Sequence, residues 1–167
     1  MFFGRKKKNN VCEENVDKSI KSPSKKHELL KKENIITGCS RMTKEDTIRK
    51  VGQMLVDSGY VNENYIEGMI EREKSFSTNI GNAVALPHGT ESVKKEVISS
   101  GIAVMTFPEG TDWGGEDVKL VIGIAGEGGT HLEILSNIAM KLMEQSVVDD
   151  LVESNDVEKI YKMFVEE

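Results

Sequence analysis

Hydrophobic residues recur at intervals of three and four along two stretches after residue 43, which is the spacing of an amphipathic helix. Thr43 with Asp46 three residues later is typical of a capped helix start, and Gly59 ends the first apolar series. Asn62 is the predicted cap of a second helix, which ends in the charged residues 71–74. The expected apolar faces are Ile48, Val51, Leu55 and Val56 for the first helix and Tyr65, Ile66, Met69 and Ile70 for the second.

Short apolar runs bounded by turn residues predict strands. These runs are 34–37, 83–86, 98–107 and 118–125, and the turn-rich stretch 108–115 separates the last two. Three further helices are predicted to begin at Thr130, Ser146 and Asn155. Buried strands interleaved with amphipathic helices indicate an α/β domain in which helices pack on a central sheet.

The beginning of the chain differs in composition from the rest. Residues 1–34 hold ten Lys and Arg against five Asp and Glu, have few apolar side chains and include a Ser-Pro-Ser segment at 22–24. Such a segment buries too little apolar surface to offset the entropy of ordering it. We therefore expect residues 1–32 to be a disordered charged tail and residues 33–167 to form a single domain.

Charge and apolar content argue against two classes of partner. Residues 35–167 hold 12 Lys and Arg against 23 Asp and Glu, so the predicted domain is acidic. An acidic body is a poor match for nucleic acid and a better match for a basic protein. The longest apolar runs have seven residues, whereas a membrane span needs about 20. The basic cluster at 5–8 beside Phe2 and Phe3 could touch an anionic membrane, but four basic residues are few for that role.

Cysteine and histidine usage predicts neither a disulfide framework nor a metal site. Cys12 and Cys39 are the two cysteines, and the three histidines lie at unrelated spacings. The first eight residues place apolar side chains before basic ones, which is the reverse of a secretory signal. We therefore expect a cytoplasmic protein without a cofactor or metal.

The first candidate for chemistry is His88, which directly follows the predicted strand at 83–86. Strand ends in α/β proteins often carry functional side chains, because a rigid sheet holds the loop in place. Pro87 restricts the backbone before the histidine, and Gly89 leaves room beside it. A lone histidine in this position is more often structural, so the pattern alone leaves its role open.

The second candidate is a glycine-rich turn at 126–129 that leads into the helix beginning at Thr130. Gly128, Gly129 and Thr130 could present backbone N–H groups to an anion at the helix N-terminus, with His131 beside them. The turn lacks the lysine of a nucleotide-binding loop, and an ordinary flexible turn explains it equally well. Arg72 could supply a guanidinium, although charged helix ends are usually only solvated.

Four blocks of the sequence resemble one known family. These are Gly-Tyr-Val at 59–61, the stretch with Arg-Glu-Lys at 70–74, the stretch with Pro-His-Gly-Thr at 80–90, and Thr-His-Leu-Glu-Ile-Leu at 130–135. They resemble the EIIA component of the sugar phosphotransferase system, in the fructose–mannitol class, and most closely its stand-alone mannitol-specific members. The resemblance covers roughly residues 33–166.

The resemblance implies a single α/β domain with a mixed central sheet and helices on both faces. It implies that His88 is phosphorylated, that His131 stabilises the phosphoryl group and that Arg72 contacts it. Phospho-HPr would be the donor and a cysteine of the mannitol EIIB domain the acceptor, with EIIC as the permease. The residues before the histidine helix depart from the family pattern, so the cradle of Gly128, Gly129 and Thr130 is the less specific part of the match.

Three alternative functions stay open from the sequence. A fructose-type or nitrogen-regulatory EIIA shares the two histidine blocks, and the Arg72 block together with the Gly-Tyr-Val segment at 59–61 favours the mannitol type over both. A regulatory binding module would use His88 phosphorylation only as a signal. A metal-dependent hydrolase using His88 and His131 would need a carboxylate ligand motif, which the sequence does not show.

Overall fold

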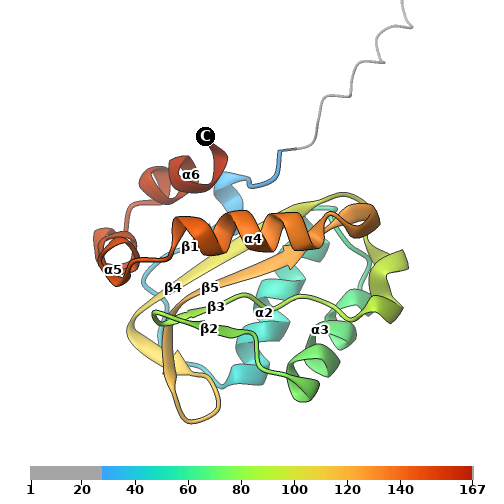
Figure 1. Ribbon diagram of the computed structural model, residues 1–167, viewed down its shortest axis with the longest axis horizontal. Helices are drawn as coiled ribbons and strands as arrows, with labels where there is room; N and C mark the ends of the chain where they lie inside the picture. The colour runs from blue at the N-terminus through green and yellow to red at the C-terminus, as the bar shows by residue number, and fades with distance from the viewer. Residues whose placement is uncertain (1–27, 167) are drawn as a thin grey trace, which may run out of the picture.

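A five-stranded mixed sheet forms the centre of the computed structural model, which describes residues 28–166 (Figure 1). The strands are β1 (Ile35–Ile36), β2 (Asn79–Gly81), β3 (Val84–Ala85), β4 (Gly101–Asp112) and β5 (Asp117–Ala125). Their order across the sheet is β1-β4-β5-β3-β2. The central pair β4 and β5 is antiparallel, β1 runs parallel to β4, and β3 runs parallel to β5.

Helices cover both faces of this sheet, as Figure 1 shows. One core joins α2 (Lys44–Asp57) and α3 (Asn64–Ser75) to the sheet, and a second core joins α4 (His131–Lys141), α5 (Gln145–Ser154) and α6 (Val157–Val165) to the opposite face. Three short 3₁₀ segments connect these elements: η2 (Lys32–Asn34), η3 (Glu91–Glu96) and η4 (Glu127–Gly129). The predicted fold class, with a mixed sheet and helices on both faces, is confirmed.

The central strands are mostly apolar over residues 101–107 and 120–125, because these parts of β4 and β5 are buried on both sides. In β4, Ile102 and Val104 belong to the core under α4 to α6, whereas Ala103 and Met105 belong to the core under α2 and α3. Successive side chains of a strand point to opposite faces, so a doubly covered strand needs apolar residues at every position. This is why the apolar residues of β4 and β5 form continuous runs in the sequence rather than alternating with polar residues.

Several predicted boundaries are wrong, each for an identifiable reason. Strand β4 continues to Asp112, where a turn was predicted, because Thr111 and Asp112 still pair with β5. Trp113, which lies within the predicted turn-rich stretch, is buried at 3% exposure. Strand β2 was not predicted, and it pairs with β3 alone along an exposed edge.

The helix caps also differ in part from the expected ones. Thr43 caps α2 as predicted, since its hydroxyl accepts a hydrogen bond from the Asp46 N–H. Helix α3 begins after Glu63 instead, and Asn62 contributes its backbone carbonyl to the Tyr65 N–H. Asn155 ends α5 in a left-handed conformation rather than starting the last helix, which Asp156 caps. Asparagine adopts the left-handed conformation more readily than most residues, which explains the ambiguity.

Residues 28–32, which the sequence analysis assigned to the tail, pack onto the domain. The Leu30 side chain is fully buried in the core under α4 to α6. The Leu29 carbonyl accepts a hydrogen bond of 2.8 Å from the Ile102 N–H, and the Tyr60 hydroxyl donates one of 2.6 Å to the Glu28 carbonyl. The remainder of the predicted tail, residues 1–27, lies outside the described residues. We therefore expect the folded unit to begin at or before Glu28.

A truncation series tests this boundary. A chain starting at Glu33 loses Leu30 and the two backbone contacts, so its free energy of unfolding should fall by about 2–4 kcal/mol relative to the full chain. A chain starting at Glu28 keeps all three and should unfold at nearly the same urea concentration as the full chain. Urea unfolding followed by tryptophan fluorescence measures both. Equal stability of the two truncated chains would contradict this assignment.

Candidate active site

His88 lies one residue after the buried Leu86-Pro87 segment, beside the end of strand β5. Its Nδ1 atom is 2.8 Å from the Leu86 carbonyl oxygen. A carbonyl oxygen can only accept a hydrogen bond, so in the neutral ring Nδ1 carries the proton and Nε2 carries the lone pair. In the neutral ring the structure therefore leaves Nε2 as the nitrogen with a free lone pair, a choice of nitrogen that the sequence left open.

The environment of His88 favours the neutral ring. Burial lowers the pKa of His88 below its ordinary value of 6.5, because the residue is only 9% exposed. The hydrogen bond to the Leu86 carbonyl raises this pKa, and the charges of Arg72 and His131 lower it. Burial is the largest of these effects. The net direction is downward, which favours the neutral form of the ring at pH 7.

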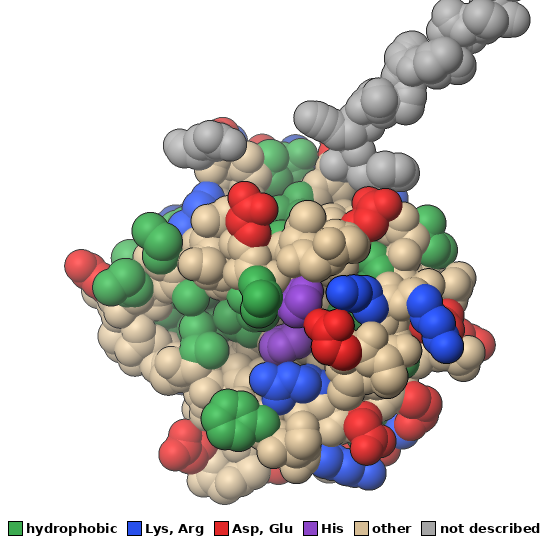
Figure 2. All heavy atoms as spheres, turned by 45° about the vertical axis from the view of Figure 1, so that its right-hand side comes forward, with side chains coloured by type: hydrophobic (Ala, Val, Ile, Leu, Met, Phe, Trp, Pro, Cys, Tyr) green, Lys and Arg blue, Asp and Glu red, His purple; other side chains and the backbone are tan. Residues whose placement is uncertain are grey.

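His131 is the first residue of α4, and its ring stands next to that of His88. The two ring centroids are 6.2 Å apart, with an angle of 36° between the ring planes. Figure 2 shows the two side chains together on one face, with basic, acidic and hydrophobic side chains around them. Residues more than 40 positions apart thus form one site, and the predicted association of the two histidines agrees with the structure.

The glycine-rich turn before His131 is tightly folded. Gly128 and Gly129 have φ values of +59° and +95°, a region that strongly favours glycine. A Cβ atom on Gly126 would lie 2.3 Å from the His131 backbone, so only glycine fits this position. These glycines set the path of the chain into the histidine helix.

Thr130 serves the turn itself rather than capping the helix. Its N–H and its hydroxyl both donate to the Glu127 carbonyl, at 3.0 and 2.8 Å. The Ser100 hydroxyl accepts from the Glu127 N–H and lies 3.1 Å from the Thr130 hydroxyl, which closes the network. The Thr130 side chain makes no capping hydrogen bond to α4. The cradle role of Gly128, Gly129 and Thr130 stays a prediction.

Arg72 lies in the last turn of α3, on the side of the molecule that faces the histidines. Its Nη1 atom donates to the Phe76 carbonyl at 2.6 Å, and its guanidinium carbon lies 5.7 Å from the centre of the Phe76 ring. These contacts hold the charge at the surface. The Arg72 charge lowers the pKa of His88. Contact of the guanidinium with a phosphoryl group stays a prediction.

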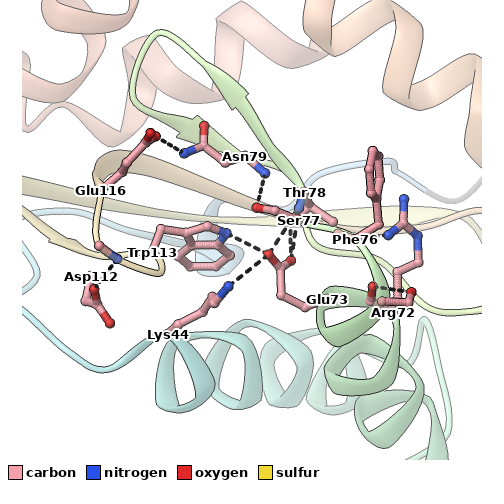
Figure 3. A network of polar contacts seen from close by, with 12 residues as sticks. Lys44, Arg72, Glu73, Phe76, Ser77, Thr78, Asn79, Asp112, Trp113 and Glu116 are labelled. Carbon is pink, nitrogen blue, oxygen red and sulfur yellow. Dashed lines mark hydrogen bonds and ion pairs between the residues drawn. The ribbon is translucent and has the colours of Figure 1, made fainter.

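A buried carboxylate next to Arg72 was missed by the sequence analysis. Glu73 is 6% exposed and accepts hydrogen bonds from the Thr78 hydroxyl and N–H and from the Trp113 indole, with Lys44 Nζ at 3.4 Å (Figure 3). Burial opposes the ionised form, but the Thr78 hydrogen bonds and the Lys44 charge outweigh it and lower the pKa of Glu73. This network joins α2, α3, β2 and the β4–β5 turn, and so fixes the segment that carries Arg72. In the sequence, Glu73 looks like one more solvated charge.

Clustered metal-ligating side chains and membrane-spanning helices are both absent from the described residues. Between residues 28 and 166, no group of three or more histidine, cysteine, aspartate and glutamate side chains could hold a metal ion. Within the same residues, none of the helices has the length and apolar content to cross a membrane.

Cys39 is half-buried, and burial raises the pKa of its thiol, so it is not an activated nucleophile.

Comparison with known proteins decides the family. Residues 28–167 match the family model described as "Phosphoenolpyruvate-dependent sugar phosphotransferase system, EIIA 2". The chain belongs to this family. It is therefore an EIIA component, a phosphoryl carrier of the sugar phosphotransferase system.

Individual relatives of this EIIA cover most of its length. It is 44% identical over 139 residues to the mannitol-specific phosphotransferase enzyme IIA component of Staphylococcus aureus (strain Mu50 / ATCC 700699), covering 83% of this chain and 96% of that protein. It superimposes on IIAMTL in the complex with phosphorylated IIBMTL from Escherichia coli with a TM-score of 0.78 and 33% identity, covering 83% and 100% of the two chains. The chain also superimposes on the crystal structure of nitrogen regulatory protein IIA-Ntr from Neisseria meningitidis with a TM-score of 0.70 and 25% identity. This match covers 82% of this chain and 97% of the other.

The opposing effects on His88 give a titration test. The midpoint of the His88 ring signals in NMR should lie below pH 6.5, and Arg72→Gln should raise it because a positive charge beside the ring is removed. Arg49→Gln is the matched control, since that arginine pairs with Glu45 and Glu67 on an exposed helix face. Folding stability should fall as the pH drops through 6.5 toward the His88 pKa, because only the unfolded chain binds the proton there. A midpoint at or above 6.5 would contradict the assigned environment.

Proposed function

We propose that this EIIA chain accepts a phosphoryl group from phospho-HPr on Nε2 of His88 and passes it to a cysteine of the mannitol EIIB domain, during uptake of mannitol by the EIIC permease. The observation that carries the proposal is the geometry of His88. Its Nδ1 proton is engaged by the Leu86 carbonyl, so the lone pair on Nε2 is left to attack, beside a second histidine. The reaction is a phosphotransfer, and the chain is its phosphoprotein intermediate.

The chemistry follows from the ring geometry. The Nε2 lone pair attacks the phosphorus of phospho-HPr, and the bond between that phosphorus and the HPr histidine breaks as the new P–N bond forms. His88 keeps its Nδ1 proton, so the ring gains positive charge that the Leu86 carbonyl oxygen stabilises. Onward transfer breaks the Nε2–P bond as the cysteine sulfur of EIIB attacks. Neither step needs a cofactor.

Stabilisation of the transferring group falls to three nearby donors. Charge spreads over the three equatorial oxygens of the transition state, so fixed hydrogen-bond donors and in-line positioning supply most of the catalysis. His131 stands beside His88, Arg72 lies within its electrostatic reach, and the amides of the turn at 128–130 precede His131. These residues are the proposed phosphoryl contacts.

The surface around the site suits short-lived protein partners. Phe76, next to Arg72, is 72% exposed, and Leu132, next to His131, is 65% exposed. Exposed apolar side chains beside a reactive group are typical of a docking surface. The acidic body complements a basic carrier protein, which speeds encounter. Together with the cysteine usage, this supports a cytoplasmic site of action with HPr and EIIB as partners.

Sequence similarity favours mannitol over the other members of the class. The identity is 44% to a mannitol-specific relative and 25% to a nitrogen regulatory protein. The fructose-type and regulatory functions are the alternatives, and both would use the same phosphorylated histidine. They differ in where the phosphoryl group goes next.

Variants at the two histidines test their roles. His88→Ala should abolish phosphorylation by enzyme I, HPr and phosphoenolpyruvate, because the nucleophile is gone. His131→Ala should still be phosphorylated, but one or both transfers should slow by roughly tens- to several-hundred-fold, the cost of losing one donor to developing charge. Rapid-quench transfer from phospho-HPr, and then to EIIB, measures each step. Incorporation of phosphate at His131 in His88→Ala would reverse the two roles.

Transfer of the phosphoryl group from this chain to EIIB domains of different sugar specificity tests the assignment to mannitol. The phosphorylated chain should transfer its phosphoryl group to purified mannitol EIIB and support formation of mannitol phosphate by EIIBC. A fructose EIIB domain in the same assay is the control and should be phosphorylated at least about tenfold more slowly. Equal transfer to both would overturn the mannitol assignment, and no transfer to either would favour the regulatory alternative.

A further inference from the structure

Tyr65 is a buried tyrosine whose hydroxyl lies between two backbone groups of the site. The residue belongs to α3 and is 4% exposed. Its hydroxyl donates to the Ile124 carbonyl at 2.7 Å and accepts from the Gly89 N–H at 2.9 Å. Burial raises the pKa of Tyr65 to about 12, so the hydroxyl keeps its proton over the pH range in which His88 reacts. Its donor and one acceptor position are therefore permanently used.

Tyr65 joins two backbone groups near His88, one on the next residue of the chain and one on the neighbouring strand β5. Gly89 directly follows His88 in the chain. Ile124 lies opposite, since its N–H donates to the Pro87 carbonyl at 2.9 Å and it forms an isolated parallel bridge with His88. The segment at 87–89 is thus attached to β5 directly at its first residue and through the Tyr65 hydroxyl at its last.

This attachment supplements sparse strand pairing. Strand β3 ends at Ala85, and beyond that point the backbone of His88 pairs with β5 through a single isolated bridge to Ile124. Packing reinforces the hydroxyl contact. A Cβ atom on Gly89 would lie 2.7 Å from both Tyr65 Cε1 and Val93 Cγ2, so the tyrosine ring sits directly against the glycine. The backbone after His88 has little freedom to shift while the ring is in place.

We propose that Tyr65 is a positioning residue for phosphoryl transfer, which holds Gly89 against Ile124 and thereby keeps Nε2 of His88 directed at the transferring group. The role rests on the proposed function of His88. Tyr65 acts on His88 through the backbone, since its hydroxyl is already hydrogen-bonded to the Gly89 N–H and the Ile124 carbonyl. Loss of the hydroxyl leaves the Gly89 N–H without its partner and releases one end of the segment at 87–89.

The test compares two tyrosine-to-phenylalanine variants in the full chain. Tyr65→Phe removes the bridging hydroxyl and keeps the ring. Tyr60→Phe is the matched control, because Tyr60 is also buried in the core under α2 and α3, and its hydroxyl also donates to a backbone carbonyl, that of Glu28. Both variants should unfold at lower urea concentration than the unsubstituted chain. Only Tyr65→Phe should affect the chemistry.

Single-turnover transfer from phospho-HPr gives the kinetic readout. In Tyr65→Phe the maximal rate should fall by at least about tenfold, the scale expected for a misplaced nucleophile, while the half-saturating phospho-HPr concentration should stay unchanged. Gly89→Ala crowds the same ring from the other side and should also lower the rate. It serves as the second variant if Tyr65→Phe unfolds. Tyr60→Phe should transfer at the rate of the unsubstituted chain.

NMR of the His88 ring gives a readout that does not depend on transfer. Tyr65→Phe should change the ring nitrogen shifts and the titration midpoint of His88, whereas Tyr60→Phe should leave both in place. Unchanged His88 signals together with an unchanged transfer rate in Tyr65→Phe would overturn the inference. If the unsubstituted chain is not phosphorylated at all, the proposed function fails, and the NMR comparison alone then decides whether Tyr65 positions His88.

Discussion

The antiparallel pair of β4 and β5 is the feature on which the rest of the molecule depends. Its strands occupy the centre of the sheet, with β1 beyond one and β3 beyond the other. Both are buried on both faces, so each helix layer finds its apolar contacts on this pair. The pair ends at Gly101 and Ala125, and His88 bridges to β5 one residue before that end, at Ile124. A rigid centre is therefore joined directly to the site.

The site combines burial with access, which a phosphoryl carrier needs. A fully exposed imidazole would be close to half protonated near pH 6.5, and a fully enclosed one could not meet another protein. His88 is largely buried on its Nδ1 side, where the Leu86 carbonyl accepts its proton, and it stands at the surface beside His131. The proton is thus held on the inner nitrogen, and the outer nitrogen is left for chemistry.

Two buried polar side chains of α3, those of Tyr65 and Glu73, form hydrogen bonds that hold the segments next to His88 and Arg72. The Tyr65 hydroxyl bonds to the backbone after His88, and slightly more than two turns later Glu73 holds the segment that carries Arg72. Each makes several hydrogen bonds to groups distant in sequence, as a buried polar group must to avoid a desolvation cost. Helix α3 therefore does more than cover the sheet, since its side chains also bond to the backbone beside His88 and to the segment that follows Arg72.

The sequence by itself determined what depends on local periodicity and on short motifs. The helix starting after Thr43, the two central strands, the acidic body and the two histidines could all be predicted, because each is set by neighbouring residues. Only the tertiary structure decided features that depend on distant partners. The burial of Leu30, the extension of β4 to Asp112 and the protonated nitrogen of His88 are of this kind. Glu73 and Tyr65 resemble an ordinary charge and an ordinary apolar contact in sequence. Their roles arise only when Thr78, Trp113, Gly89 and Ile124 are folded against them, because a hydrogen bond requires both partners to meet in space.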